Sequence, residues 1–180
     1  MILRVTINRS LYPTGSLMDV SLANPFINAT LNVLEIMAKV SCRVEKPYIK
    51  IDATARGDVT GLIGLSGIAR GSVSVTFDEA SILKIVSNLL GEEVTSLNEE
   101  IRDAVGEITN MISGQARKEL SEKGRIFKAS IPTVITGKNH EIRHLTKDPV
   151  IAIPFITNEG RFMIEICLEE TRNGRKDGKK

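Results

Sequence analysis

The feature that most constrains the fold of this 180-residue chain is one order of elements that occurs twice. In the first half, hydrophobic periodicity predicts a helix, three strands and a short helix, at about 23–41, 44–52, 58–66, 70–77 and 78–90. The second half repeats the order with a long helix and three strands, at about 97–123, 126–136, 148–157 and 161–169. A chain built this way is expected to fold as two similar units.

The closing strands of the two halves show the repetition most directly. Residues 71–77 (Gly-Ser-Val-Ser-Val-Thr-Phe) and 160–166 (Gly-Arg-Phe-Met-Ile-Glu-Ile) both alternate after a glycine turn. We therefore predict an α/β (α+β) sandwich, a pseudo-symmetric repeat of helix plus three-stranded units. Its sheet is mainly antiparallel, with two long helices on one face. The second unit lacks the short closing helix, and its exposed sheet edge predicts pairing with a second subunit in a homodimer.

Local signals mark the helix ends. Asn24 is predicted to cap the first helix, with Pro25 at the first helical position. Asp78 is predicted to cap the short helix and Gly91 to end it, while Gly124 ends the long helix. The last of these signals bounds the long helix, on which the candidate site depends.

The long helix is amphipathic, and its polar face carries a row of residues. Its apolar stripe is formed by Ile101, Ala104, Val105, Ile108, Met111, Ile112 and Ala116. Asp103, Glu107 and Asn110, at i, i+4 and i+7, line up on the opposite side. Gly114 extends the row by one turn. A mid-helix glycine costs roughly 1 kcal/mol against alanine, so Gly114 either gives room to a partner or packs against another element of this chain.

The spacing alone is weak evidence for function. A second Glu-x-x-Asn pattern occurs at 170–173, in a basic tail where it carries no meaning. A solvated helix face presents the same residue types.

Several segments together resemble the CheC/CheX/FliY family of chemotaxis phosphatases. They are the row Asp103-x3-Glu107-x2-Asn110 with Pro132 after it, and the segments 18–20, 24–30, 132–134 and 149–155. The resemblance covers roughly residues 18–169, which is nearly the whole chain. We assign no catalytic role to Pro132.

The resemblance implies the same pseudo-symmetric fold and a phosphatase that acts on a phosphorylated CheY-type response regulator. It implies that Asn110 orients the attacking water and that Glu107 pairs with a lysine of the receiver domain. Asp103 and Gly114 would contribute to partner binding. The chain itself would bind no metal or other cofactor, because the receiver supplies Mg²⁺. The alternative is a non-enzymatic adaptor of the same fold that binds CheY or the flagellar switch; the presence of both Glu107 and Asn110 favours the enzyme.

If the halves are repeats, the helix at 23–41 is the twin of the long helix. Its exposed face is predicted to carry Asn28, Asn32, Glu35 and Lys39. Aligning Asn28 with Asn110 puts Pro25 where Glu107 would be. The first half therefore keeps the amide without the carboxylate, which resembles the one-site members of the family rather than the two-site members.

A histidine-containing motif suggests a different kind of site, a zinc centre. The segment 140–144 (His-Glu-Ile-Arg-His) matches the zincin pattern H-E-x-x-H, which requires a helix to bring both imidazoles to one zinc ion. The segment lies between two predicted strands, has no apolar stripe and contains the only histidines of the chain. We predict a polar loop between strands and discount a zinc hydrolase. The glycines Gly61, Gly64, Gly67 and Gly71 fit no nucleotide-binding loop and are interpreted as strand and turn glycines.

Charge and composition bound the remaining classes. The net charge is +2, but the two ends both carry an excess of basic residues, so the body at 18–170 is mildly acidic. Because this body is acidic and contains no Trp, it is not expected to bind nucleic acid. No apolar stretch is long enough to span a membrane, and residues 1–17 do not resemble a signal peptide.

We divide the chain into an N-terminal extension (1–17), the phosphatase-like domain (18–170) and a basic flexible tail (171–180). Met18 is a second candidate start, and residues 1–17 could equally be native sequence, a misassigned start or added sequence. Cys42 and Cys167 lie far apart without a CxxC partner, so reduced core thiols in a cytoplasmic protein are expected rather than a disulfide.

Overall fold

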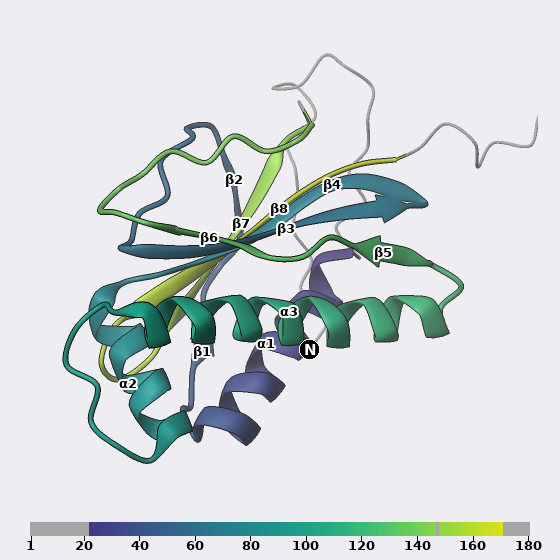
Figure 1. The fold of residues 1–180 in the computed structure, drawn as a ribbon. Helices are drawn as coiled ribbons and strands as arrows, with labels where there is room; N and C mark the ends of the chain where they lie inside the picture. Colours follow the sequence, from purple (N-terminus) through teal and green to yellow (C-terminus); the bar gives the residue numbers. More distant parts are fainter. Residues whose placement is uncertain (1–21, 147, 171–180) are drawn as a thin grey trace, which may run out of the picture.

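Three helices lie against one face of an eight-stranded sheet in the computed structural model, which describes residues 22–146 and 148–170 (Figure 1). In chain order the elements are α1 (Ala23–Ala38), β1 (Arg43–Val44), β2 (Tyr48–Lys50), β3 (Val59–Gly67), β4 (Ala69–Phe77), α2 (Glu79–Leu90), α3 (Glu99–Glu122), β5 (Phe127–Ala129), β6 (Thr133–Thr136), β7 (Val150–Ile156) and β8 (Arg161–Glu170). The fold prediction is confirmed. The extension at 1–17 and the tail at 171–180 lie outside the described residues.

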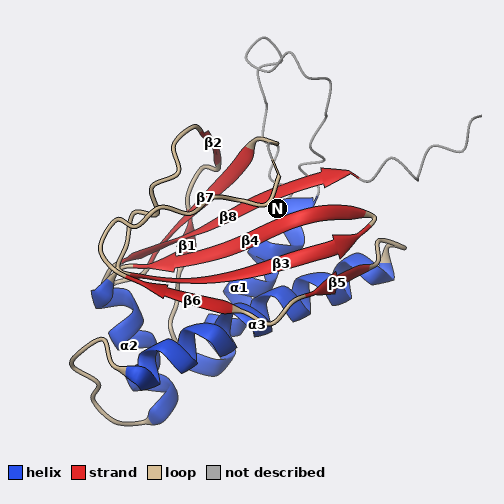
Figure 2. Ribbon diagram, turned by 45° about the horizontal axis from the view of Figure 1, so that its top comes forward, coloured by secondary structure: helices blue, strands red, loops and turns tan. Residues whose placement is uncertain are grey.

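The strand order reveals how the two units combine. The sheet runs β1-β7-β8-β4-β3-β5, with β2 also paired to β7 and β6 to β3, and all these pairings are antiparallel (Figure 2). The hairpins β3–β4 and β7–β8 meet at the centre through β4 and β8. Each unit's first strand, in two short pieces, borders the hairpin of the other unit. The repeat predicted from the sequence is thus present, with its outer strands exchanged. The pairing of an outer sheet edge with a second subunit, in a homodimer, stays a prediction.

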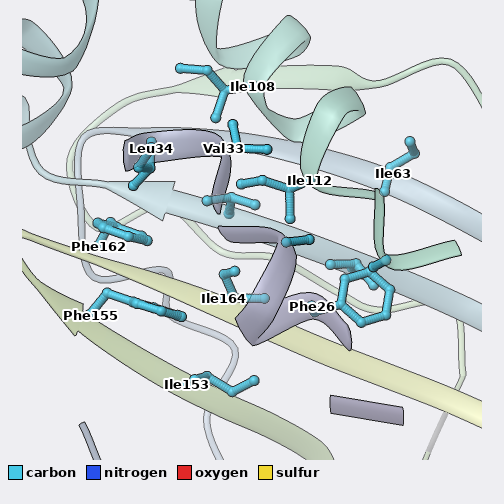
Figure 3. Close-up of a cluster of buried hydrophobic side chains, with 14 of the residues drawn as sticks. Phe26, Val33, Leu34, Ile63, Ile108, Ile112, Ile153, Phe155, Phe162 and Ile164 are labelled. Carbon is cyan, nitrogen blue, oxygen red and sulfur yellow. The ribbon is translucent and has the colours of Figure 1, made fainter. Parts of the chain in front are cut away.

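Side chains on the helix-facing side of the sheet form the hydrophobic core. Phe26, Val33 and Leu34 of α1 and Ile108 and Ile112 of α3 pack there (Figure 3). From the sheet come Ile63, Ile153, Phe155, Phe162 and Ile164 (Figure 3). Because strand side chains alternate between faces, one apolar face of the sheet buries the apolar stripes of both long helices. This packing fixes α3, and therefore its polar row, relative to the sheet.

The opposite face of the central strands is polar although it is buried. Ser72, Ser74 and Thr76 of β4 and Glu165 of β8 point there, each at most 2% exposed. The loop between β6 and β7 meets this face, where His144 hydrogen-bonds Ser72 and Glu165. Buried polar groups require such partners, because an unpaired one costs free energy.

Some boundary predictions hold and others fail. Asp78 caps α2 by accepting a hydrogen bond from the Ser81 amide at 2.9 Å, and Gly91 ends it in a left-handed conformation, as predicted. Asn24 does not cap α1, which is a correction: the cap position is Leu22, and Asn24 and Pro25 are the second and third helical residues. Pro25 is tolerated there because the first four helical amides have no acceptor within the helix.

Two predicted strands are interrupted. The strand expected at 44–52 becomes β1 and β2, and the strand expected at 126–136 becomes β5 and β6. Against β3, Leu65 pairs with Ala129 and Leu62 with Thr133, so three residues face two in the gap. Pro132 lies in this gap and has no amide hydrogen to donate to the ladder. In the described part of the chain, none of the helices is both long enough and apolar enough to span a bilayer.

Candidate functional site

Local chemistry determines where α3 begins. Asn98 accepts a hydrogen bond from the Ile101 amide at 3.0 Å, and Glu99 and Glu100 occupy the first turn. A side-chain cap and acidic residues both stabilise a helix start, because they satisfy free amides and complement the helix dipole. The helix then continues for 24 residues to Glu122. The predicted apolar stripe faces the core, with Ala104 and Met111 only partly buried at its margin.

The predicted row is on the solvent side of this helix. Asp103, Glu107 and Asn110 are exposed, and Gly114 is half-buried one turn further along. None of the three polar side chains makes a hydrogen bond or ion pair with a described residue. Their functional groups are therefore available to a partner.

Side chains beside the row are engaged within the chain. Arg102 pairs with Glu99, and Gln115 accepts a hydrogen bond from Asn32 of α1 at 2.9 Å. The unpaired state of the row is thus not a general property of the polar residues of α3.

A close contact with β3 holds this part of the helix. Thr109, next to Asn110, is buried, and its hydroxyl donates to the Val105 carbonyl at 2.7 Å. A Cβ on Gly61 of β3 would lie 1.9 Å from the Thr109 Oγ1. Gly61 is therefore required for α3 to approach the sheet here. The sequence predicted only a strand glycine at this position, although a glycine in mid-strand is the signal for such an approach.

Gly114 is not explained by packing inside the chain. A Cβ added there would meet only the Arg117 Nη2, at 4.0 Å. Among the described residues, the glycine thus packs against no neighbouring element of the chain, which does not support the packing explanation. Room for a partner stays a prediction.

The twin helix α1 uses its amides internally. Asn28, Asn32, Glu35 and Lys39 are exposed, as predicted. The Asn28 amide donates to the Glu119 carboxylate of α3 at 3.3 Å. The residue that aligns with Asn110 is therefore tied to the neighbouring helix, and Pro25 replaces the carboxylate. These contacts support a single site on α3.

The H-E-x-x-H segment is a loop, as predicted. The His140 ring contacts the Gly137 carbonyl and the Thr60 hydroxyl, at 2.6 and 2.8 Å. The His144 ring contacts Ser72 at 2.8 Å and Glu165 at 3.2 Å. Both nitrogens of each imidazole are thus engaged: those of His144 contact β4 and β8, and those of His140 contact β3 and the loop after β6. The pair therefore cannot share a zinc ion in this arrangement. The described ranges contain no cluster of three residues suited to holding a metal.

Both cysteines are free thiols. Burial, with a smaller contribution from the Glu35 carboxylate, raises the pKa of the Cys42 thiol to about 11. Burial also raises the pKa of Cys167, which lies on the polar sheet face beside Thr146. Neither thiol has the lowered pKa of a nucleophile, and the prediction of reduced structural cysteines is confirmed.

Solved structures place this fold in a known class. The CheX structure from Vibrio vulnificus superposes with a TM-score of 0.79 and is 48% identical, over 83% of this chain and 99% of that one. A CheX–CheY–BeF₃–Mg²⁺ complex from Borrelia burgdorferi superposes with a TM-score of 0.72, over 84% of this chain and all of that one; at 24% identity this likeness shows the fold alone. The class is that of the CheX- and CheC-like chemotaxis proteins.

Sequence comparison narrows the class to a family. The profile described as chemotaxis phosphatase CheX matches residues 59–156. A curated relative, the CheY-P phosphatase CheX of Thermotoga maritima, is 26% identical over 127 residues, which are 70% of this chain and 82% of the relative. The chain belongs to the chemotaxis phosphatase CheX family.

Proposed function

We propose that this protein dephosphorylates a phosphorylated CheY-type response regulator in the cytoplasm. The observation that carries the proposal is the row on α3, whose carboxylates and amide are exposed and have no partner among the described residues, whereas the nearby Arg102 and Gln115 are engaged. Membership of the CheX family and the name of the Thermotoga relative, a CheY-P phosphatase, support the substrate class.

The reaction is hydrolysis of an aspartyl phosphate. A water oxygen bonds to phosphorus, the bond from phosphorus to the aspartate oxygen breaks, and the products are a free carboxylate and inorganic phosphate. The receiver contributes the aspartate, a lysine and the Mg²⁺ ion, which leaves the position of the water to be fixed. We assign that role to Asn110, because an amide can both donate to and accept from water without adding negative charge near the phosphoryl group.

The neighbours of Asn110 orient the partner. We assign Glu107 to an ion pair with the receiver's lysine and Asp103 to docking. Gly114 leaves room for the receiver's backbone against the helix. This chain needs no metal of its own in this reaction, because Mg²⁺ enters with the receiver.

The test is release of phosphate from phosphorylated receiver by wild type and by Asn110→Ala. We expect the variant to lose on the order of 10²-fold in rate, because the water is no longer held in line. Its melting temperature should stay unchanged, because Asn110 is exposed and unpaired. Asn28→Ala, which removes the matching amide on α1, is the control and should keep full activity.

Other results separate the alternatives. Full activity of Asn110→Ala would contradict the proposed mechanism. If wild type binds the phosphorylated receiver but does not accelerate its phosphate release, the adaptor is favoured. Glu107→Lys should weaken binding, and unchanged affinity would remove its docking role.

A further inference from the structure

Arg117 continues the row beyond Gly114. It lies seven residues after Asn110, which is almost two helical turns, and it therefore returns to the same side of α3. The side chain is half-buried and folds back over Gly114, with its Nη2 4.0 Å from the position that a Cβ on that glycine would take. This places the guanidinium about four residues, or roughly 6 Å along the axis, from Asn110.

The guanidinium has no counter-ion among the residues that the structure describes. Its Nε is buried without a hydrogen-bond partner, and Arg117 makes no ion pair with any residue in 22–146 or 148–170. By contrast, Arg102 near the start of α3 pairs with Glu99, and Lys123 at its C-terminal cap pairs with Glu119. One turn away from Arg117 on either side stand Ser113, Gly114, Leu120 and Ser121, none of which is acidic.

The exposed face of α3 thus has charge of opposite sign at its two ends. Asp103 and Glu107 make the end before Asn110 negative, and Arg117 makes the end after it positive. A surface with separated charges admits a partner in one orientation only, because reversing the partner would bring like charges together. Arginine is suited to the positive end, because its planar fork binds a carboxylate with two parallel hydrogen bonds.

We propose that Arg117 determines specificity by binding a surface carboxylate of the receiver, next to the phosphorylated site that Asn110 addresses. This inference rests on the proposed function and adds a contact that the motif Asp103–Glu107–Asn110 does not contain. Arg117 meets the protein surface around the phosphoryl group rather than the group itself, since Gly114 separates it from Asn110. Its contribution is to binding and orientation, and the chemical step does not pass through it.

The experiment measures the affinity for a CheY-type receiver activated with beryllofluoride and Mg²⁺, at low and high salt, together with phosphate release. Arg117→Met keeps the length and packing of the side-chain stem while removing the charge. We expect Kd and KM to rise on the order of tenfold, with kcat unchanged and a weaker dependence of Kd on salt. Arg117→Lys should recover part of the affinity, because it restores the charge without the fork.

Lys118→Met is the matched control, since it removes a neighbouring exposed cation about 100° around the helix. It should leave Kd, KM and the salt dependence unchanged. Unchanged Kd in Arg117→Met, or an equal loss in Lys118→Met, would overturn the inference. A fall in kcat at constant KM would also overturn it, because it would place the guanidinium at the reacting group.

Phosphate release and receiver binding are separate readouts. A wild type that binds the receiver through Arg117 without releasing phosphate would refute the phosphatase function and keep this contact.

Discussion

Adding one methyl group to the sheet at Gly61 should move the candidate site. In Gly61→Ala the new Cβ would start 1.9 Å from the Thr109 Oγ1 and 2.9 Å from its Cβ, whereas an ordinary contact begins at 3.4 Å. The helix and β3 must therefore separate by about 1.5 Å locally. Overpacking of this kind costs about 1–3 kcal/mol, and each kcal/mol lowers Tm by about 2–4 °C in a chain of this size.

Activity should fall as well, because Asn110 follows Thr109 directly. A misplacement of about 1 Å can cost about 10²-fold in rate, so kcat for phosphate release is expected to fall much more than the modest loss of Tm alone would cause. The assays are thermal unfolding and single-turnover phosphate release. Thr109→Ala in the same chain should restore part of both, because it removes the hydroxyl and methyl groups that the new Cβ would meet.

Gly106→Ala is the control for the added methyl group. On the same helix its Cβ would meet the Val134 Cγ2 at an ordinary 3.5 Å. Its stability should rise by about 0.5–1 kcal/mol through helix propensity alone. If Gly61→Ala kept the Tm and kcat of wild type, the reasoning would be refuted, because the position of α3 would not depend on its close approach to β3.

Two further predictions concern the rest of the sheet and the first cysteine. Lys50→Met removes the cation paired with Glu165 where both side chains are at most 3% exposed, and leaves His144 as the partner of that carboxylate. It should cost about 3–5 kcal/mol in urea unfolding. Arg70→Met, from an exposed cross-strand pair, should cost under about 1 kcal/mol, and equal losses would contradict this. Because the pKa of Cys42 is raised from 9.0 to about 11, its contribution to stability is complete below pH 9 and is lost as pH rises towards 11. Between pH 8 and 10.5, the free energy of unfolding measured in urea should therefore fall more in wild type than in Cys42→Ala. An equal fall in both proteins would exclude this contribution.

The parts of the fold that could be predicted from the sequence are those set by local chemistry. Asp78 and Gly91 bound α2 because a cap and a left-handed end depend on a few neighbouring residues. The row on α3 could be predicted because its spacing and the apolar stripe follow from helical geometry alone. The same kind of rule failed at Asn24, because Pro25 is acceptable throughout the first turn and so does not mark the first residue.

The parts that could not be predicted depend on contacts between distant segments. Alternation identified β4 and β8 as strands, but nothing within a strand states which strand lies beside it. The contact of Gly61 with Thr109 and the ion pair of Lys50 with Glu165 likewise join residues far apart in the chain. Arg117 was within reach of sequence reasoning, since it lies at i+7 from Asn110, but its unpaired guanidinium is a property of the folded chain.

The exchange of outer strands has a consequence for how the chain folds during synthesis. Arg43 of β1 pairs with Ile156 of β7, so β1 cannot take its place in the sheet until residue 156 has left the ribosome. Pairings between such distant residues slow folding, because a long loop must close before they form. We therefore expect neither unit to fold on its own, and expect α3 with its row to take its fixed position only when the other half is in place.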